Sequence, residues 1–188
     1  MACNLATGRT EPCKQYIGGL DYIYIFKWSD VDYDSMGNIN SDAIPMTAYL
    51  KKSGGQIYAY KFDLKGINSF ESTSTVSQET AGKVFDQSIT VTLKGLDSVS
   101  VTQFNELMSE KTIAFVKERN QDLYYFFGGV NGMTNNGVLS SGQAMADLNG
   151  VTFTLTGQER VPFKTFNSTA PLSVLNIAVS ASQIAPTV

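Results

Sequence analysis

The sequence predicts a single, mainly β domain over residues 1–188, built as an antiparallel β-sandwich or partial barrel with one α-helix. Three observations support this fold class. Several segments alternate apolar and polar residues, which is the pattern of a half-buried strand. One segment alone has clear helical spacing. The chain of 188 residues suits one core that would bury about 70% of the unfolded surface.

Three segments carry the strand pattern most clearly. In residues 56–65 the side chains predicted to face the core are Tyr58, Tyr60, Phe62 and Leu64, opposite Lys61, Asp63 and Lys65. In residues 85–94 they are Phe85, Ile89, Val91 and Leu93, and in residues 151–156 they are Val151, Phe153 and Leu155. We expect these segments to form an antiparallel sheet with one buried face.

Four further segments complete the predicted strands. Residues 111–118 and 123–128 form a hairpin through the polar turn 119–122, and residues 21–28 and 46–52 follow the pattern more weakly. Residues 124–127 are all aromatic, which indicates a strand buried on both sides. The total of about seven strands, separated by Gly and Asn turns, favours a sandwich or barrel.

The predicted helix covers residues 98–110. Ser100 and Gln103 form a capping box near its start. Its apolar stripe, which we expect to pack against the sheet, consists of Val101, Phe104, Leu107 and Met108.

Residues 66–82 are a polar, Ser- and Thr-rich connector of 17 residues between two predicted strands. A loop of this length is uncommon in a compact domain unless it is functional or disordered. Two interpretations stay open: an arm that orders on a neighbouring subunit, or a surface loop. The residues of the proposed arm are Gly66, Asn68, Phe70, Glu71, Gln78, Glu79 and Gly82. Residues 1–19 are predicted to be an extended leader, and residues 160–188 a C-terminal extension.

Catalytic and metal-binding patterns are weak. The chain has no histidine, which excludes Ser-His and Cys-His nucleophile pairs. Cys3 and Cys13 cannot fill a four-ligand zinc site, and they are either free thiols or a disulfide. Asp30, Asp32 and Asp34 begin a calcium-loop pattern, but serines stand where it needs glycine at the sharp turn and glutamate at the end. Residues 128–132 lack the lysine of a phosphate loop and predict a turn. We expect no catalytic residues and no cofactor.

Charge and hydropathy limit the partners. The net charge is −3 and only 16% of residues are charged, so a basic nucleic-acid-binding surface is not expected. No apolar run approaches the roughly 20 residues of a membrane span, and the first residues lack the apolar stretch of a signal peptide. We expect a protein without a membrane span, made in a cytoplasm.

Short phrases of the sequence resemble structural proteins of tailed bacteriophages. The leader contains Ala2-Cys3-Asn4-Leu5, Gly8-Arg9, Pro12-Cys13-Lys14 and Gly18-Gly19. Similar phrases follow at 85–87, 93–96, 142–150 and 154–159, so that the resemblance covers most of residues 2–160. The order of strands, long loop, helix and hairpin is similar to that of the tail tube proteins.

This resemblance implies a function. Tail tube proteins are β-sandwiches or partial barrels that close into rings of six copies, and the rings stack into the tube through which DNA leaves. It implies that residues 66–82 dock on the adjacent ring and that the helix lies on the outer side. The implied partners are copies of the chain, other tail proteins, and DNA that passes without specific binding, in a virion assembled in the host cytoplasm.

The threonines at 90, 92, 152, 154 and 156 give a separate hypothesis. Their hydroxyl-rich face would suit a wet channel, provided that it is not buried within the monomer. Three alternatives to the tail tube remain: a head-tail connector, a capsid decoration protein, or a carbohydrate-binding module that uses Trp28 and the tyrosines.

Overall fold

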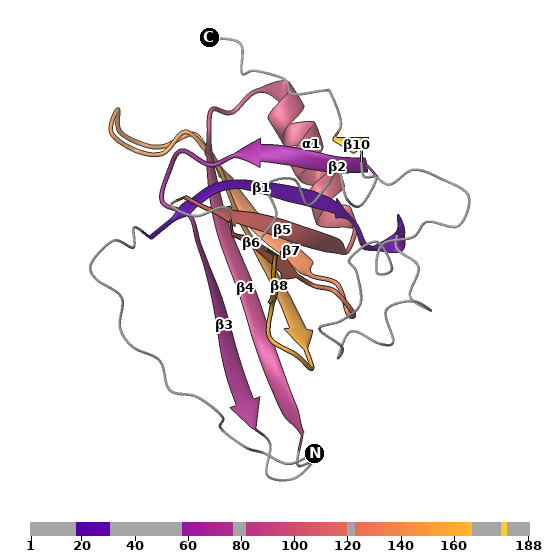
Figure 1. The fold of residues 1–188 in the computed structure, drawn as a ribbon. Helices are drawn as coiled ribbons and strands as arrows, with labels where there is room; N and C mark the ends of the chain where they lie inside the picture. The colour runs from indigo at the N-terminus through magenta and orange to yellow at the C-terminus, as the bar shows by residue number, and fades with distance from the viewer. Residues whose placement is uncertain (1–17, 31–57, 77–81, 120–122, 167–177, 180–188) are drawn as a thin grey trace.

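The computed structural model describes residues 18–30, 58–76, 82–119, 123–166 and 178–179. In this part of the chain two sheets of mainly antiparallel strands pack together, with one α-helix beside them (Figure 1). The predicted fold class, a mainly β sandwich with a helix, is confirmed. The elements in chain order are β1 (Leu20–Lys27), a short 3-10 helix (Trp28–Asp30), β2 (Tyr58–Asp63), β3 (Ser69–Val76), β4 (Lys83–Lys94), α1 (Ser98–Ser109), β5 (Thr112–Glu118), β6 (Tyr124–Phe127), β7 (Thr134–Ser140), β8 (Gly150–Glu159), β9 (Lys164–Phe166) and β10 (Ala178–Val179).

Six strands form the first sheet, in the order β10-β2-β1-β5-β6-β9. β1 lies between β2 and β5 and runs antiparallel to both. β5 and β6 form the predicted hairpin, with Phe115 opposite Phe126. The outermost strands, β9 and β10, both come from residues 160–188. Within the predicted C-terminal extension, β9 pairs with β6 and β10 pairs with β2.

Four strands form the second sheet, in the order β3-β4-β8-β7. Every neighbouring pair is antiparallel, so the edge strands β3 and β7 run in opposite directions. β4 and β8 follow the predicted alternation: Ile89, Val91, Phe153 and Leu155 are buried, whereas the threonines between them are not.

The connector at residues 66–82 is not the loop that its composition predicts. Ser69–Val76 form β3, which pairs along its whole length with β4. The prediction is wrong because an edge strand can expose most of its side chains, and the apolar alternation that marks a buried strand is then missing. Residues 77–81 lie outside the described part of the chain.

The main core lies between the two sheets. It contains Ile23 and Ile25 of β1, Ala114 and Val116 of β5, and the buried residues of β4 and β8. The opposite face of the six-stranded sheet is also buried, with the ring of Phe115 4.9 Å from that of Phe126 and 5.6 Å from that of Phe26. Strand β6 is thus buried on both sides except for half-buried Tyr125, as predicted.

The prediction for β2 is wrong at two positions. Tyr58 and Tyr60 are 52% and 45% exposed, whereas Ala59 between them is completely buried. Phe62 is half-buried against the core and Leu64 is buried, as predicted. Tyr60 pairs with Ile25 of the core, so it lies on the predicted face of β2, but its side chain is not covered at this end of the strand. Alternation assigns residues to a face and does not say how far along the strand that face is covered. The predicted strand at 46–52 lies outside the described residues.

The helix forms where it is predicted. α1 begins at Ser98, and the N–H of Val101 donates to the Asp97 carbonyl at 3.1 Å, so a capping box starting at Ser100 is wrong. Phe104, Leu107 and Met108 pack against the core. Val101 is 41% exposed and departs from the predicted stripe.

Candidate functional site

The outer face of the four-stranded sheet carries mainly hydroxyl and amide side chains, with Val84, Val138 and Lys94 among them. Alternate residues of the four strands supply them, because successive side chains of a strand point to opposite faces. None of these four strands places an aromatic residue on this face. One row across the sheet is Ser69, Thr90, Thr154 and Asn136, and the next is Glu71, Ser88, Thr156 and Thr134.

The channel hypothesis requires that the threonines of this polar face are not buried within the monomer, and they are not. Their side chains are half-buried, and that of Thr156 is exposed, so none is buried within the monomer. Thr90 Oγ1 lies 3.5 Å from Thr154 Oγ1, and Thr92 Oγ1 lies 3.5 Å from Thr152 Oγ1. These cross-strand pairs stabilise the sheet and leave further hydroxyl lone pairs for a partner or water.

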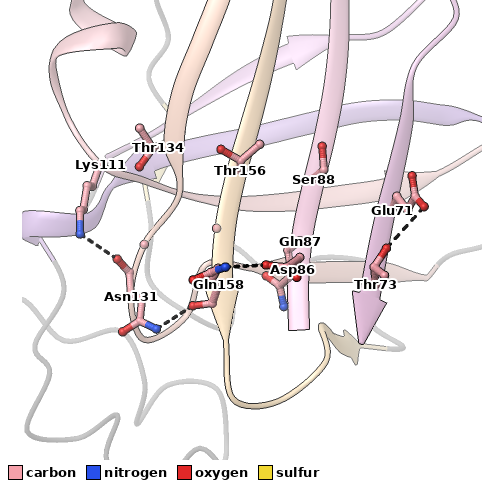
Figure 2. Close-up of a pocket in the computed structure, with 12 residues that line it drawn as sticks. Glu71, Thr73, Asp86, Gln87, Ser88, Lys111, Asn131, Thr134, Thr156 and Gln158 are labelled. Carbon is pink, nitrogen blue, oxygen red and sulfur yellow. Dashed lines mark hydrogen bonds between the residues drawn. The ribbon is translucent and has the colours of Figure 1, made fainter. Parts of the chain in front are cut away.

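An open groove of about 750 Å³ crosses the polar face (Figure 2). Residues of β3, β4, β8 and the turn before β7 line it. Gln158 Nε2 donates to Asp86 Oδ1 at 2.7 Å, and Thr75 Oγ1 donates to Asp86 Oδ2 at 3.3 Å. Thr73 Oγ1 donates to Glu71 Oε1 at 3.5 Å. Two pairs of polar side chains that line the groove, Gln158 with Asp86 and Thr73 with Glu71, are therefore bonded to each other.

The charged side chains that line the groove are not arranged around one place where a substrate could react. Lys111 Nζ donates to the Asn131 carbonyl at 3.3 Å and lies 5.4 Å from the centre of the Trp28 ring. Among the described residues there is no group of three or more His, Cys, Asp or Glu that could hold a metal ion. What this surface offers is an array of donors and acceptors for water or for another polar surface.

A buried carboxylate supports the turn at one end of the groove. Glu159, the last residue of β8, is 3% exposed, and its Oε1 accepts the N–H groups of Val130 and Asn131, each at 2.9 Å. Glu159 Oε2 is buried without a hydrogen-bond partner. Burial raises the pKa of Glu159, and the bonds from Asn131 and Val130 lower it, with a net rise.

The turn itself is the one predicted at residues 128–132. Gln87 Oε1 accepts the N–H of Gly128 at 3.1 Å, and Gly128 and Gly132 both have φ of +71°. Gly132 also lies against the Trp28 ring, where a Cβ would approach Cδ1 to 2.5 Å. Asn131 Nδ2 donates to the Gln158 carbonyl at 2.6 Å. The prediction of a turn between strands is confirmed.

Two strand edges are open in the described structure. β3 and β7 are the outer strands of the four-stranded sheet, and no described strand pairs with their outer edges. Their side chains are largely exposed, including Val76 at 67% and Val138 at 65%. An open edge presents unpaired N–H and C=O groups that can pair with another chain.

The predicted arm residues are divided between the domain and its surface. Asn68 is buried, and its Oδ1 accepts the N–H of Thr92 at 2.7 Å, while its Nδ2 has no partner. Glu71 lies on the polar face. Gly66 is half-buried before β3, and Gly82 is half-buried directly before β4. Gln78 and Glu79 lie outside the described residues.

Phe70 is the clearest correction among the arm residues. Its ring centre lies 4.7 Å from that of Tyr125, 5.2 Å from that of Phe127 and 5.3 Å from that of Phe163. It therefore packs between the sheets of its own monomer. A single large apolar residue in a polar strand anchors that strand to its own core.

The helix lies on the side of the four-stranded sheet away from the polar face. A Cβ at Gly137 of β7 would meet the Phe104 ring at 2.6 Å, and Gly137 belongs to the inner row of β7. Asn135, in the same row, donates from Nδ2 to the carbonyls of Leu107 and Glu110. It also accepts a hydrogen bond from Thr112 Oγ1 at 3.0 Å.

Of the aromatic residues suggested for carbohydrate binding, Tyr22, Tyr24 and Tyr124 lie together on one face of the six-stranded sheet. The ring centre of Tyr22 lies 5.2 Å from that of Tyr24 and 6.2 Å from that of Tyr124. Trp28 lies at the turn formed by residues 128–132, where its Nε1 donates to the Val130 carbonyl at 3.1 Å. Tyr58 and Tyr60 lie on β2, and Tyr124 is buried on β6 with its hydroxyl 2.7 Å from that of Tyr22.

Sequence reasoning missed β7 and Glu159. β7 has the sequence TNNGVLS, in which two Asn and a Gly hide the strand. Glu159 did leave a signal, because it continues the inward-facing series of Val151, Phe153 and Leu155. A carboxylate in that series indicates a buried polar contact.

Two further findings concern membrane spans and similarity to known proteins. Within the described residues, no helix has the length and apolar character needed to cross a membrane. Comparison of the chain with protein-family models, with curated proteins and with solved structures gave no match.

Proposed function

We propose that this chain is a structural virion protein that forms the stacked rings of a phage tail tube, the conduit for DNA delivery. The observation that carries the proposal is the four-stranded sheet, with its two open edges and its polar outer face. The resemblance of short sequence phrases to tailed-phage structural proteins points the same way.

The open edges supply a way to close a ring. Because β3 and β7 run in opposite directions, β7 of one copy can pair with β3 of the next as antiparallel strands when the copies are related by rotation. Repeated pairing joins the four-stranded sheets into one closed barrel without a free edge. Such a contact joins two different surfaces of identical chains, as a ring requires.

The polar face supplies a lumen that would not hold DNA. Binding to phosphates needs clustered Lys and Arg. The middle of this face carries hydroxyls with the carboxylates of Glu71 and Asp86, and the whole chain has a net charge of −3. In the tube the polar face points inward, and α1 and the six-stranded sheet lie outside.

Electron microscopy of the purified protein tests this proposal. We expect rings or tubes of uniform bore, and antibody labelling of virions along the tail rather than at the head or neck. Replacing Val138, which is exposed on edge strand β7, by Lys should abolish rings because an edge charge opposes strand pairing. Replacing Val101, exposed on α1, by Lys is the matched control and should leave rings intact.

The proposal is abandoned if the wild-type protein stays monomeric at every concentration and labels no part of the tail. Labelling of the head or neck would assign it to a decoration protein or a connector instead. Specific retention of monomers by a glycan array would favour the carbohydrate-binding module.

A further inference from the structure

A small cavity lies beside the glycine turn of residues 128–132, where the two sheets meet. Gln87 of β4 and Glu159 of β8 line it from the four-stranded sheet, and Phe126 of β6 and Lys164 of β9 line it from the six-stranded sheet. Its volume is about 10 Å³. A cavity needs roughly 10–15 Å³ to hold one water molecule. This cavity is therefore of the size that a single water molecule or a small ion occupies.

A buried carboxylate oxygen at this cavity lacks a partner in the described part of the chain. Glu159 is only 3% exposed, and its Oε1 accepts the N–H groups of Val130 and Asn131, each at 2.9 Å. Its Oε2 is buried and accepts no hydrogen bond from the described residues. An unpaired buried carboxylate oxygen is costly, so a hydrogen-bond donor is expected beside Oε2.

Two further polar groups lie at the same cavity, which both Gln87 and Val161 line. Gln87 Oε1 accepts the N–H of Gly128 at 3.1 Å, and this bond fixes the orientation of the Gln87 amide. Gln87 Nε2 lies 3.5 Å from the Val161 carbonyl, which is longer than an ordinary N–H···O bond of about 2.7–3.2 Å. The amide nitrogen has two N–H groups, so it can also donate into the cavity.

We propose that this cavity binds one water molecule, which donates to Glu159 Oε2 and to the Val161 carbonyl and accepts a hydrogen bond from Gln87 Nε2. Three hydrogen bonds are typical of a buried water. The water joins β4 and β8 of the four-stranded sheet to the segment that leads into β9 of the six-stranded sheet. The site is formed within one subunit and does not depend on the proposed assembly.

The groups around the cavity suit water better than a cation. A bound cation needs oxygen ligands on several sides. Here Gln87 presents its N–H groups, because its oxygen is bonded to Gly128, and the positively charged side chain of Lys164 also lines the cavity. Water can donate and accept at once, so it matches a site that contains both kinds of group.

A crystal structure that resolves ordered water tests the site directly. We expect one peak of electron density within hydrogen-bond distance of Glu159 Oε2, Gln87 Nε2 and the Val161 carbonyl. Crystals soaked in rubidium chloride or manganese chloride identify a cation instead, because rubidium and manganese scatter anomalously and water does not. We expect no anomalous peak in the cavity.

A substitution tests whether the carboxylate holds the water. Glu159→Met keeps the length of the side chain and removes the acceptor, so the density peak should disappear, because a cavity without polar partners stays dry. Glu71→Met makes the same change at an exposed position of the same sheet and should leave the peak in place. If Glu159→Met does not fold, the wild-type map still decides whether the site exists.

Three outcomes overturn the inference. A wild-type map without density in the cavity excludes the water, and an anomalous peak there replaces it by a cation. A peak that persists in Glu159→Met shows that Glu159 does not hold the water. Each outcome leaves the proposed tail tube function untouched, since that function is tested by rings, tubes and labelling of virions.

Discussion

Replacing Phe70 by Ala should destabilise the monomer strongly. A buried Phe→Ala substitution costs about 3–5 kcal/mol, and each aromatic pair adds about 0.5–1.5 kcal/mol beyond area burial. Phe70 is half-buried and contacts three rings, at centre separations of 4.7, 5.2 and 5.3 Å. We therefore expect a loss near the lower end, about 3 kcal/mol of unfolding free energy.

The assay is urea unfolding monitored by tyrosine and tryptophan fluorescence. Because self-association would add to the apparent stability, both proteins should carry Val138→Lys to keep them monomeric. Ile67→Ala is the matched control, since Ile67 lies three residues away and is 94% exposed. The control should change the unfolding free energy by no more than about 0.5 kcal/mol.

A different result would contradict this packing. If Phe70→Ala costs as little as the Ile67 control, the ring does not hold β3 against the core. Phe70 would then be free to contact a neighbouring copy, as the loop interpretation of residues 66–82 supposed. Loss of tubes with unchanged monomer stability would make that interpretation the better one.

Three further substitutions test the interior. Burial raises the pKa of Glu159 in the folded state, so the unfolding free energy of the wild type should fall as pH rises from the ordinary Glu pKa of about 4.3 through the raised value. Glu159→Gln should lack that fall when the two proteins are compared by urea unfolding between about pH 4 and 8. Parallel profiles of the two proteins would contradict this prediction. Gly150→Ala should lower the unfolding free energy by about 1–3 kcal/mol, because the added Cβ would overlap the Leu93 carbonyl. Gly18→Ala is the control and should be neutral, because no atom lies within 4 Å of its added Cβ. Equal melting temperatures of the two variants would refute the clash. Asn135→Ala should cost about 2 kcal/mol in the same urea assay, because it leaves the carbonyls of Leu107 and Glu110 and the Thr112 hydroxyl without this partner. A loss under about 0.5 kcal/mol would argue against this anchor.

The buried strands and the helix were predictable because burial imposes a pattern. β4 and β8 keep apolar residues at nearly every second position to fill the core, and α1 keeps them at every third or fourth. Edge strands do not need this apolar pattern. β3 needs only Phe70 to attach it to the core, and β7 needs Asn135 under the helix, so neither has an apolar series to detect.

The polar face was predictable in part. The threonines of β4 and β8 stand between apolar residues and could be assigned to one face from their spacing alone. Their neighbours across the sheet, such as Glu71 and Asn136, depend on strand order and register, which single-strand patterns do not contain.

The order of strands in the six-stranded sheet has a consequence for biosynthesis. Its interior strand β1 is made first, but its two outermost strands, β9 and β10, are made last. A nascent chain that has reached Glu159 already holds all four strands of the second sheet, yet the first sheet still lacks both flanks. Pairing over such long sequence separations is slow. The six-stranded sheet is therefore incomplete until residue 179 has been synthesised, and copies still on the ribosome would be poor substrates for the polymerisation that we propose.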